Sequence, residues 1–397
     1  MLPFAGFTIA ALPKIIFGSG SLPRAVTEAA AFGRHILLVT GARSLDKSPS
    51  WPLLHAALER HGLSHDRVRI DCEPSPEWVD ATVARFHGHG IACVLAIGGG
   101  SVLDAGKAVA GMLPSGRSVL DHLEGVGPQL PYPGPALPLV AAPTTAGTGS
   151  EATKNAVLSR HGRDGFKKSF RDDKLVARVA VVDPDCLMGA PDALLAANGM
   201  DAFTQLLESY TSTRANPLTD ALALAGMQAF RDGFFAVWEK TPEAAAGRSR
   251  LAYASLLSGI CLAQTGLGVV HGLASPLGAH TTIPHGVVCG TLLAVATEVN
   301  IRALRQREPE SPALDKYARI GAMLAHRHLS QADGLAHLVR TLHTWVERLG
   351  ISPLVPAGFD PAEMDAVVAK SGGSSMKTNP LVLTDPEIRE ILERRLR

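Results

Sequence analysis

Four residues in the second half of the chain are of types that bind metal ions, and their spacing suits a shared site. Asp201 and Gln205 are four residues apart, so a helix would place both side-chain oxygens on one face. His271 and His285 follow further along, and Pro284 predicts that a separate helix begins at His285. Two imidazoles, a carboxylate and an amide oxygen suit a divalent ion such as iron(II) or zinc(II).

Each of these residues also has an ordinary structural interpretation. Asp201 fits a helix cap or a surface acid, and Gln205 fits a polar residue on a helix surface. A histidine in an apolar segment, as at His271 or His285, is more often a hydrogen-bonded core residue than a ligand. From the residues alone, both interpretations therefore stay open.

Two glycine-rich loops in the first half could bind a nucleotide. The first, residues 98–107, follows the apolar run 93–97, and its three glycines let the backbone approach a ligand closely. Ser101 and Asp104 have the spacing of a capping box, so we expect a helix to begin at Ser101 with its N-terminus toward an anion. The second loop, residues 143–151, offers hydroxyl groups after another apolar run. Neither loop is a Walker A or G-x-G-x-x-G motif, and a tight turn without a ligand is the alternative.

Alternating strand-like and helix-like segments should position these loops. The predicted strands are residues 35–40, 68–70, 93–97, 137–141 and 180–182, and the predicted helices between them include residues 52–59 and 78–86. This alternation favours a parallel α/β sheet. Because ligands bind at the carboxyl ends of parallel strands, a nucleotide is expected there.

After residue 186 the pattern is helical almost throughout. Helical periodicity marks residues 198–210, 218–235, 248–265, 314–324 and 331–349. A chain of 397 residues exceeds what one core usually organises. We therefore predict an α/β domain over residues 1–186 and an all-helical domain over residues 187–397, with the site in a cleft between them.

The composition favours a globular protein that acts on a small molecule. Hydrophobic residues make up 46% and charged residues 19%, and the formal net charge of +1 gives no field for nucleic acid or an anionic membrane. Five dispersed cysteines without a C-x-x-C pair are typical of reduced thiols in the cytoplasm. The apolar segment 1–12 lacks the basic start of a secretory signal.

Several separate motifs, in order along nearly the whole chain, resemble the iron-containing (group III, metal-dependent) alcohol dehydrogenase family. They are residues 13–20, 98–107, 143–150, 182–184, 201–210, 271–286 and 375–380. The resemblance implies an α/β dinucleotide-binding domain with a parallel sheet followed by an all-α metal-binding domain, the dehydroquinate synthase-like fold. It also implies hydride transfer between an alcohol and NAD(P), or reduction of the corresponding aldehyde or ketone.

The resemblance assigns roles to individual residues. The cofactor's diphosphate would be bound by Gly99, Gly100, Ser101 and Asp104, and its ribose and nicotinamide by Thr144, Thr145, Thr148 and Ser150, with Lys167 nearby. The metal ligands would be Asp201, Gln205, His271 and His285. Asp201, His271 and His285, together with Ser275, would act in catalysis.

Two residues depart from the family pattern. Gln205 stands where the family usually has histidine, and Ser275 where it commonly has a histidine concerned with proton movement. Each change removes a basic nitrogen, which implies a metal held more weakly or of different identity, another proton route, or a metal-free relative. The first is favoured, because Asp201, His271 and His285 keep most of the ligand set.

The sequence leaves more than one possibility open for the cofactor and for the activity. Where many relatives have an aspartate for the adenosine ribose, this chain has Gly41 with Arg43 close by, which slightly favours NADP over NAD. One alternative activity is metal-independent reduction of a maleylacetate-like acid, with Lys167 and Lys377 binding the acid. Others are a non-catalytic nucleotide-binding homologue and, less favoured, phosphate-ester or lyase chemistry on the related fold. The expected partner is a small alcohol or aldehyde, and residues 15–17 could pair across a homodimer.

Overall fold

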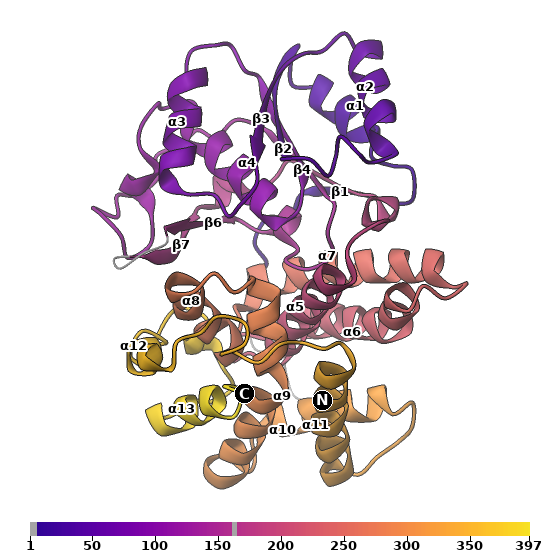
Figure 1. The fold of residues 1–397 in the computed structure, drawn as a ribbon, viewed down its shortest axis with the longest axis vertical. Helices are drawn as coiled ribbons and strands as arrows, with labels where there is room; N and C mark the ends of the chain where they lie inside the picture. Colours follow the sequence, from indigo (N-terminus) through magenta and orange to yellow (C-terminus); the bar gives the residue numbers. More distant parts are fainter. Residues whose placement is uncertain (1–5, 161–164) are drawn as a thin grey trace. The chain divides into compact units, whose positions relative to one another are not determined.

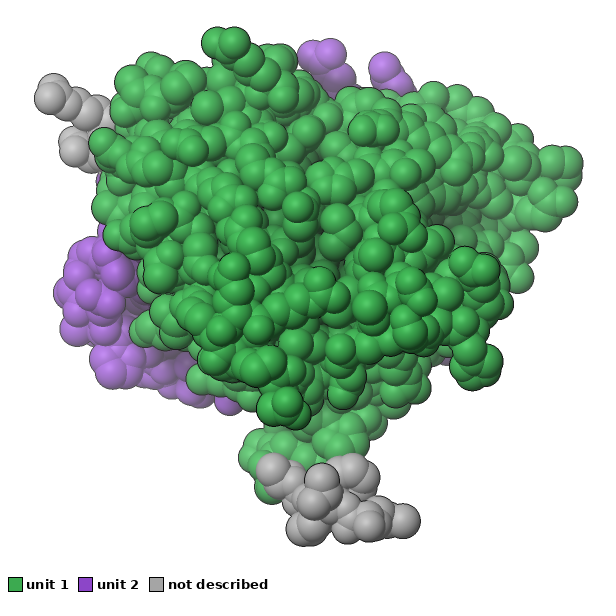
Figure 2. All heavy atoms as spheres, turned by 90° about the horizontal axis from the view of Figure 1, so that it is seen from below, with its two compact units in different colours: residues 1–9, 161–166, 191–397 green, residues 10–160, 167–190 purple. Residues whose placement is uncertain are grey.

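The computed structural model describes residues 6–160 and 165–397, which form two compact units (Figure 2). We call residues 10–160 and 167–190 the α/β unit. We call residues 191–397, with the short segments 6–9 and 165–166, the helical unit. Residues 1–5 of the apolar N-terminal segment lie outside the described residues.

A six-stranded parallel sheet with the order β1-β8-β5-β4-β2-β3 forms the centre of the α/β unit (Figure 1). Its strands are β1 (Lys14–Phe17), β2 (His35–Gly41), β3 (Ser64–Ile70), β4 (Cys93–Gly98), β5 (Leu139–Pro143) and β8 (Val179–Val182). β4 and β5 are buried along their whole length, which explains their uninterrupted apolar sequences. The predicted parallel sheet is confirmed.

Helices connect these strands, and a small second sheet accompanies them. The helices are α1 (Arg24–Ala30), α2 (Ser50–Arg60), α3 (Pro76–Phe86) and α4 (Gly100–Met112). The second sheet pairs β6 (Asn155–Arg160) with β7 (Phe166–Arg171), and the sequence pattern does not predict it. Its strands read NAVLSR and FKKSFR, in which polar and basic residues interrupt the apolar signal.

The helical unit contains the helices that follow residue 191 (Figure 1). They are α5 (Asp192–Thr211), α6 (Pro217–Trp238), α7 (Ala244–Thr265), α8 (Val269–His280), α9 (His285–Arg307), α10 (Pro312–Leu324), α11 (Gln331–Arg348), α12 (Met364–Ala369) and α13 (Asp385–Glu393). The all-helical second half is confirmed. α9 begins at His285 directly after Pro284, as predicted.

α5 lies at the core of the helical unit and contacts α6, α7, α9 and α10. Its residues are buried almost without interruption over the last four turns. Asp201, Gln205 and Glu208 are among these buried residues. Because unpaired polar groups are costly in a protein interior, these three side chains need partners inside the unit.

α9 is the second core helix of this unit. It is long and apolar enough to cross a membrane, but 83% of its most apolar window is buried inside the fold. The core helix of a globular domain has the same length and composition. Burial therefore accounts for the apolar sequence of α9.

Candidate metal centre and nucleotide loops

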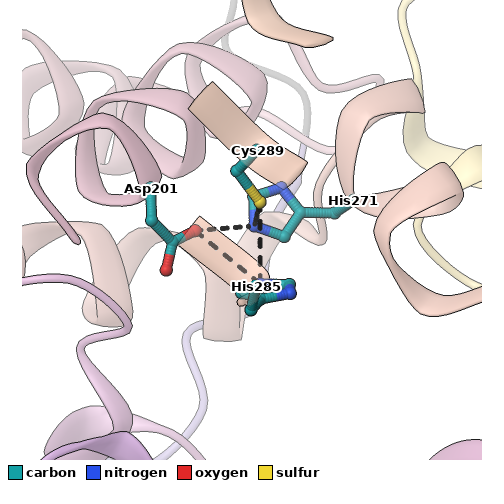
Figure 3. A group of neighbouring side chains, drawn as sticks. All are labelled: Asp201, His271, His285 and Cys289. Atoms are coloured by element: carbon teal, nitrogen blue, oxygen red, sulfur yellow. Dashed lines mark hydrogen bonds and ion pairs between the residues drawn. The ribbon is translucent and has the colours of Figure 1, made fainter. Parts of the chain in front are cut away.

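Four side chains from three helices converge in the helical unit (Figure 3). Asp201 comes from α5, His271 from α8, and both His285 and Cys289 from α9, where they are one turn apart. Their donor atoms all lie within 4.8 Å of one another. Asp201 and Cys289 are buried, whereas the His285 side chain is 27% exposed. The cluster is thus buried and accessible on one side. We call these four residues the metal cluster.

The distances within the metal cluster fit a shared ion. Asp201 Oδ1 lies 3.2 Å from His271 Nε2 and 3.7 Å from His285 Nε2. Tetrahedral bonds of about 2.0–2.3 Å would place neighbouring donors about 3.3–3.6 Å apart. A charge-assisted hydrogen bond between such groups is shorter, about 2.7–2.9 Å. The observed separations lie about 0.1 Å to either side of the tetrahedral range, so the three donors are close enough to share one divalent ion.

Glu208 orients His271. Its Oε2 lies 2.7 Å from His271 Nδ1, and its Oε1 accepts a hydrogen bond of 2.7 Å from the backbone N–H of Val270. With Nδ1 engaged by a carboxylate, the Nε2 atom faces the metal cluster, the arrangement common for metal-binding histidines. Burial opposes a charge on the imidazole, but Cys289, Asp201 and Glu208 together raise the pKa of His271 well above its usual value.

Asp201 remains ionised in this buried setting. Burial would raise the pKa of Asp201, but His285 and His271 outweigh it and lower the pKa below its usual value. Gln205, one turn along α5, directs its amide nitrogen to Asp201 Oδ1 at 3.4 Å. Its amide oxygen accepts a hydrogen bond of 2.8 Å from the hydroxyl of Ser258.

The structure thus brings together the four predicted metal ligands and adds two residues that sequence reasoning missed. Cys289 and Glu208 belong to the same constellation; Cys289 lies outside the family motifs, and Glu208 lies within the motif 201–210 but is assigned no role by the resemblance. The available signal was spacing: Cys289 is one helical turn after His285, and Glu208 is two turns after Asp201.

The tail motif supports the start of α8. Asn379 Oδ1 accepts a hydrogen bond of 3.0 Å from the backbone N–H of Val269, beside the bond from Val270 to Glu208. A Cβ at Gly268 would come within 2.9 Å of both side-chain oxygens, so only glycine leaves room for them. The tail therefore helps to place the helix that carries His271.

Ser275 and His280 lie further along α8. Ser275 is one turn after His271 and hence on the same face of the helix. His280 Nδ1 lies 3.0 Å from Glu363 Oε2, and its Nε2 lies 3.1 Å from Lys370 Nζ. Both ring nitrogens of His280 are therefore engaged within the helical unit.

In the α/β unit, the predicted cofactor residues follow the carboxyl ends of neighbouring strands. β2 ends at Gly41, β4 at Gly98 and β5 at Pro143, and these strands are adjacent and parallel. The sheet order runs from β2 to β3 on one side and continues from β2 to β4 on the other. The change of direction makes a topological switch point beside Gly41 and the first glycine loop, where nucleotides bind in open α/β sheets.

The two glycine loops meet at the N-terminus of α4. A Cβ at Gly99 would lie 3.3 Å from Thr145 Oγ1, and one at Gly100 would lie 2.9 Å from Thr148 Oγ1. Gly99, which has no side chain, occupies the N-cap of α4, so the prediction of a capping box beginning at Ser101 is wrong. The helix N-terminus keeps the positive end of its dipole for an anion.

The carboxylate of Asp104 bonds to groups outside α4 and does not cap the helix. It accepts hydrogen bonds from Ser150 Oγ at 2.6 Å and from the backbone N–H of Val157 at 3.1 Å. Lys107, which is fully buried, donates to Ser150 Oγ at 2.7 Å and to Thr153 Oγ1 at 2.8 Å. This network ties the second glycine loop to α4.

Lys167 contacts a carboxylate outside the second loop. It is on β7 and forms an ion pair with Glu73, which also accepts a hydrogen bond from Ser159. Its side chain is therefore held by a carboxylate of the α/β unit.

The comparisons with known proteins agree with the fold of each unit. A model of "Iron-containing alcohol dehydrogenase" matches residues 13–184, and one of the "Fe-containing alcohol dehydrogenase family, C-terminal" matches residues 195–396. The chain belongs to the iron-containing alcohol dehydrogenase family. This alcohol dehydrogenase is therefore a metal-dependent oxidoreductase of alcohols and aldehydes, and the family implies NAD(H) and a divalent metal, typically iron.

Several named relatives and solved structures share this similarity. Alcohol dehydrogenase 4 of Schizosaccharomyces pombe is 30% identical over 95% of this chain and 86% of its own length. Alcohol dehydrogenase 4 of Saccharomyces cerevisiae is 32% identical over 76% and 75%. The solved structure of an iron-containing alcohol dehydrogenase from Thermotoga maritima is 26% identical, covers 98% of this chain and 99% of its own, and has a TM-score of 0.82. The fold and family inferred from the motifs are confirmed.

Proposed function

We propose that this alcohol dehydrogenase holds its divalent ion through Asp201, His271 and His285 and transfers hydride between a small alcohol and NADP. The observation that carries the proposal is the convergence of the metal cluster, whose donor atoms come from three helices and all lie within 4.8 Å of one another. His271 places its two ring nitrogens beside two carboxylates: Nδ1 lies 2.7 Å from Glu208 Oε2, and Nε2 lies 3.2 Å from Asp201 Oδ1.

A bound divalent ion would supply polarisation of the substrate oxygen, and a bound nicotinamide would supply the hydride acceptor or donor. Asp201, His271 and His285 hold the ion, and Glu208 keeps His271 Nε2 turned toward it. Ser275, in place of the family's histidine, offers a hydroxyl one turn from His271 that can pass on the alcohol's proton.

In the α/β unit, the residues named for the cofactor divide into two roles. Gly99 and Gly100, with Ser101, would bring the backbone at the N-terminus of α4 close to the diphosphate. Thr144, Thr145 and Thr148 would contact the ribose and nicotinamide. Asp104 and Ser150 would hold the two loops together, since each is bonded to protein atoms.

The preference for NADP rests on arginines near the end of β2. Arg67 and Arg69 both bond to Asp46, at 2.6 and 3.1 Å, so one carboxylate serves two guanidinium groups. Arg43 adds a further positive charge just after Gly41. A surplus of arginine favours a 2′-phosphate. We expect Arg43→Ala to lower kcat/KM for NADP about tenfold and to leave the value for NAD nearly unchanged.

The other activities have less support. A metal-independent reductase would not need two histidines, a carboxylate and a thiol converging inside a helical core. Lys167, one of the cations suggested for an acidic substrate, is paired with Glu73. The five free cysteines are compatible with the cytoplasmic location that we propose.

The test is to purify the protein without added metal, measure its metal content, and follow NAD and NADP reduction over a panel of small alcohols. We expect about one divalent ion per chain, and activity that a chelator abolishes and the same ion restores. Full activity after complete metal removal would contradict the proposal and favour the metal-independent reductase. Nucleotide binding without turnover of any alcohol or aldehyde would favour the non-catalytic homologue.

A further inference from the structure

We propose that Cys289 is the fourth ligand of the metal, and that Gln205 positions Asp201 instead of binding the ion. This inference rests on the proposed function, because it assumes that a divalent ion occupies the metal cluster. It concerns Gln205, the predicted metal ligand that stands where the family usually has histidine. The donor set would then be one carboxylate, two imidazoles and one thiolate.

The sulfur of Cys289 has the position of a ligand. Its Sγ lies 3.6 Å from Nε2 of His271 and 3.6 Å from Nε2 of His285. A tetrahedral ion with a metal–sulfur bond of about 2.3 Å and metal–nitrogen bonds of about 2.0–2.1 Å would hold these atoms about 3.6 Å apart. Figure 3 shows the sulfur facing both rings and the Asp201 carboxylate across the cluster.

The other buried cysteines show what an ordinary core cysteine looks like in this chain. Cys93 Sγ contacts the backbone carbonyl of Val94 at 3.4 Å, and Cys261 Sγ contacts that of Thr219 at 3.6 Å. Both sulfurs act as weak donors to a main-chain oxygen. Cys289, in contrast, is directed at side chains that bind metals, so the core interpretation does not account for its surroundings.

Gln205 is arranged as a hydrogen-bond donor to Asp201. A carboxylate can only accept hydrogen bonds, so the amide group that faces Asp201 is the NH2 group. In this orientation the amide oxygen, which is the atom able to bind a cation, faces the hydroxyl of Ser258 on α7 at 2.8 Å. That hydroxyl also lies 2.8 Å from the backbone oxygen of Ser255. The amide nitrogen lies 3.4 Å from Asp201 Oδ1, so Gln205 supports the carboxylate from one turn along α5.

A thiolate has consequences for the choice of metal. On binding, the thiol loses its proton to solvent, and the sulfur's electron pair forms the bond to the ion. Thiolate is a softer donor than an amide oxygen or an imidazole, and therefore shifts preference toward zinc(II) relative to iron(II).

The test uses the full-length protein loaded with zinc(II) or cobalt(II), and its main readout is spectroscopic. X-ray absorption at the zinc edge should reveal one sulfur neighbour at about 2.3 Å. The cobalt form should show a thiolate-to-cobalt charge-transfer band. Cys289→Ala should abolish both signals and weaken zinc binding at least about 100-fold. Cys261→Ala removes an equally buried thiol of the same unit and should leave both signals intact.

Gln205→Ala separates the two candidate fourth ligands. We expect the sulfur signals to persist in this variant, with a smaller loss of zinc affinity of about tenfold, because only the support of Asp201 is removed. A wild-type spectrum with nitrogen and oxygen neighbours alone would overturn the cysteine ligand while leaving the proposed function standing. This result needs no variant and hence does not depend on folding of a mutant. A chain that binds no divalent ion would overturn both.

Discussion

The two units each bury a charged network, and they differ in where the positive charge comes from. In the α/β unit it comes from Lys107, whose ammonium group lies 3.4 Å from Asp104 and bonds to Ser150 and Thr153. In the helical unit, Asp201 and Glu208 flank a histidine instead. A lysine charge is part of the chain, whereas a histidine proton can be exchanged for an ion.

This difference separates a structural network from a ligand site. Lys107 also donates to the backbone oxygen of Asn155 at 2.9 Å, so its three protons have protein acceptors close by. Such a network is complete without a ligand, and it ties α4 to the second glycine loop. The metal cluster gathers a carboxylate, two imidazoles and a thiol around one point, and under the proposed function a divalent ion would supply its positive charge.

The largest effect is expected from removing a charge from the metal cluster. Asp201→Asn keeps the size of the side chain and removes the only carboxylate among the four cluster residues. We expect the metal content to fall to near zero and kcat/KM to fall about 10⁴-fold, because polarisation by the ion is worth several kcal/mol. Elemental analysis and steady-state kinetics measure both.

Asp192→Asn is the matched control for this substitution. Asp192 lies in the first turn of the same helix and pairs with Lys240 at the surface. An exposed ion pair contributes at most about 1 kcal/mol, so activity and metal content should stay near wild type. Equal losses in both variants would mean that α5 is damaged, and the charge of Asp201 would then not be the cause.

The corresponding change in the α/β unit is Lys107→Met. It leaves Asp104 beside a buried apolar chain, and breaking a buried ion pair in this way costs about 3–5 kcal/mol of unfolding free energy. The metal content of the folded protein should not change. Chemical denaturation measures the loss, and Lys14→Met, which removes an exposed pair with Glu28, should cost less than about 1 kcal/mol. A metal-free but stable Lys107→Met protein would reverse the assignment of the two networks.

The sequence predicts the glycine loops of the α/β unit better than the metal cluster of the helical unit. The first glycine loop is contiguous, since the apolar run of β4, residues 98–100 and the start of α4 follow one another. Local chemistry therefore indicates both the strand and the loop. The error lay in the capping box, because the side chain of Asp104 is bonded to Ser150, which is 46 residues away.

The metal cluster depends on packing between helices that are far apart in sequence. Asp201, His271 and His285 carry family motifs, and resemblance rather than spacing supports them. Cys289 has no motif and lies in an apolar helix, where a cysteine usually belongs to the core. Only the packing of α5, α8 and α9 places its sulfur beside two imidazoles. The two-stranded sheet was missed for a different reason, because β6 and β7 are short and half polar.

The network of the α/β unit contains a second acid, Glu151, so that two carboxyl groups interact with the single lysine, Lys107. Glu151 is fully buried, and burial raises its pKa to about 7. A carboxyl group with a raised pKa in the folded state favours folding at low pH and loses this contribution as the pH rises from about 4.5 to about 7. We expect Glu151→Gln to gain stability relative to wild type over this window, by about 3 kcal/mol at pH 8.

Denaturation at pH 4 and pH 8 tests this expectation. The two proteins should differ least at pH 4, where the glutamic acid is protonated both folded and unfolded. A constant difference between the two pH values would indicate that Glu151 is ionised in the folded protein and that Lys107 neutralises both acids. The network would then contain two ionised carboxylates, Asp104 and Glu151, against the one positive charge of Lys107.

The smallest effect is expected from Glu208, which contacts the metal cluster without belonging to it. Glu208→Gln keeps an acceptor for the His271 ring N–H but removes the negative charge that strengthens this bond. Metal affinity should fall about 10–100-fold, as is typical when the partner of a ligand histidine is changed. Competition with a chromophoric chelator measures it. Because the carboxylate also receives the backbone N–H of Val270, thermal stability in excess metal should be compared alongside. A loss of stability with unchanged metal affinity would make Glu208 a cap for α8 alone, and the helical unit would then orient its ligand histidine by packing.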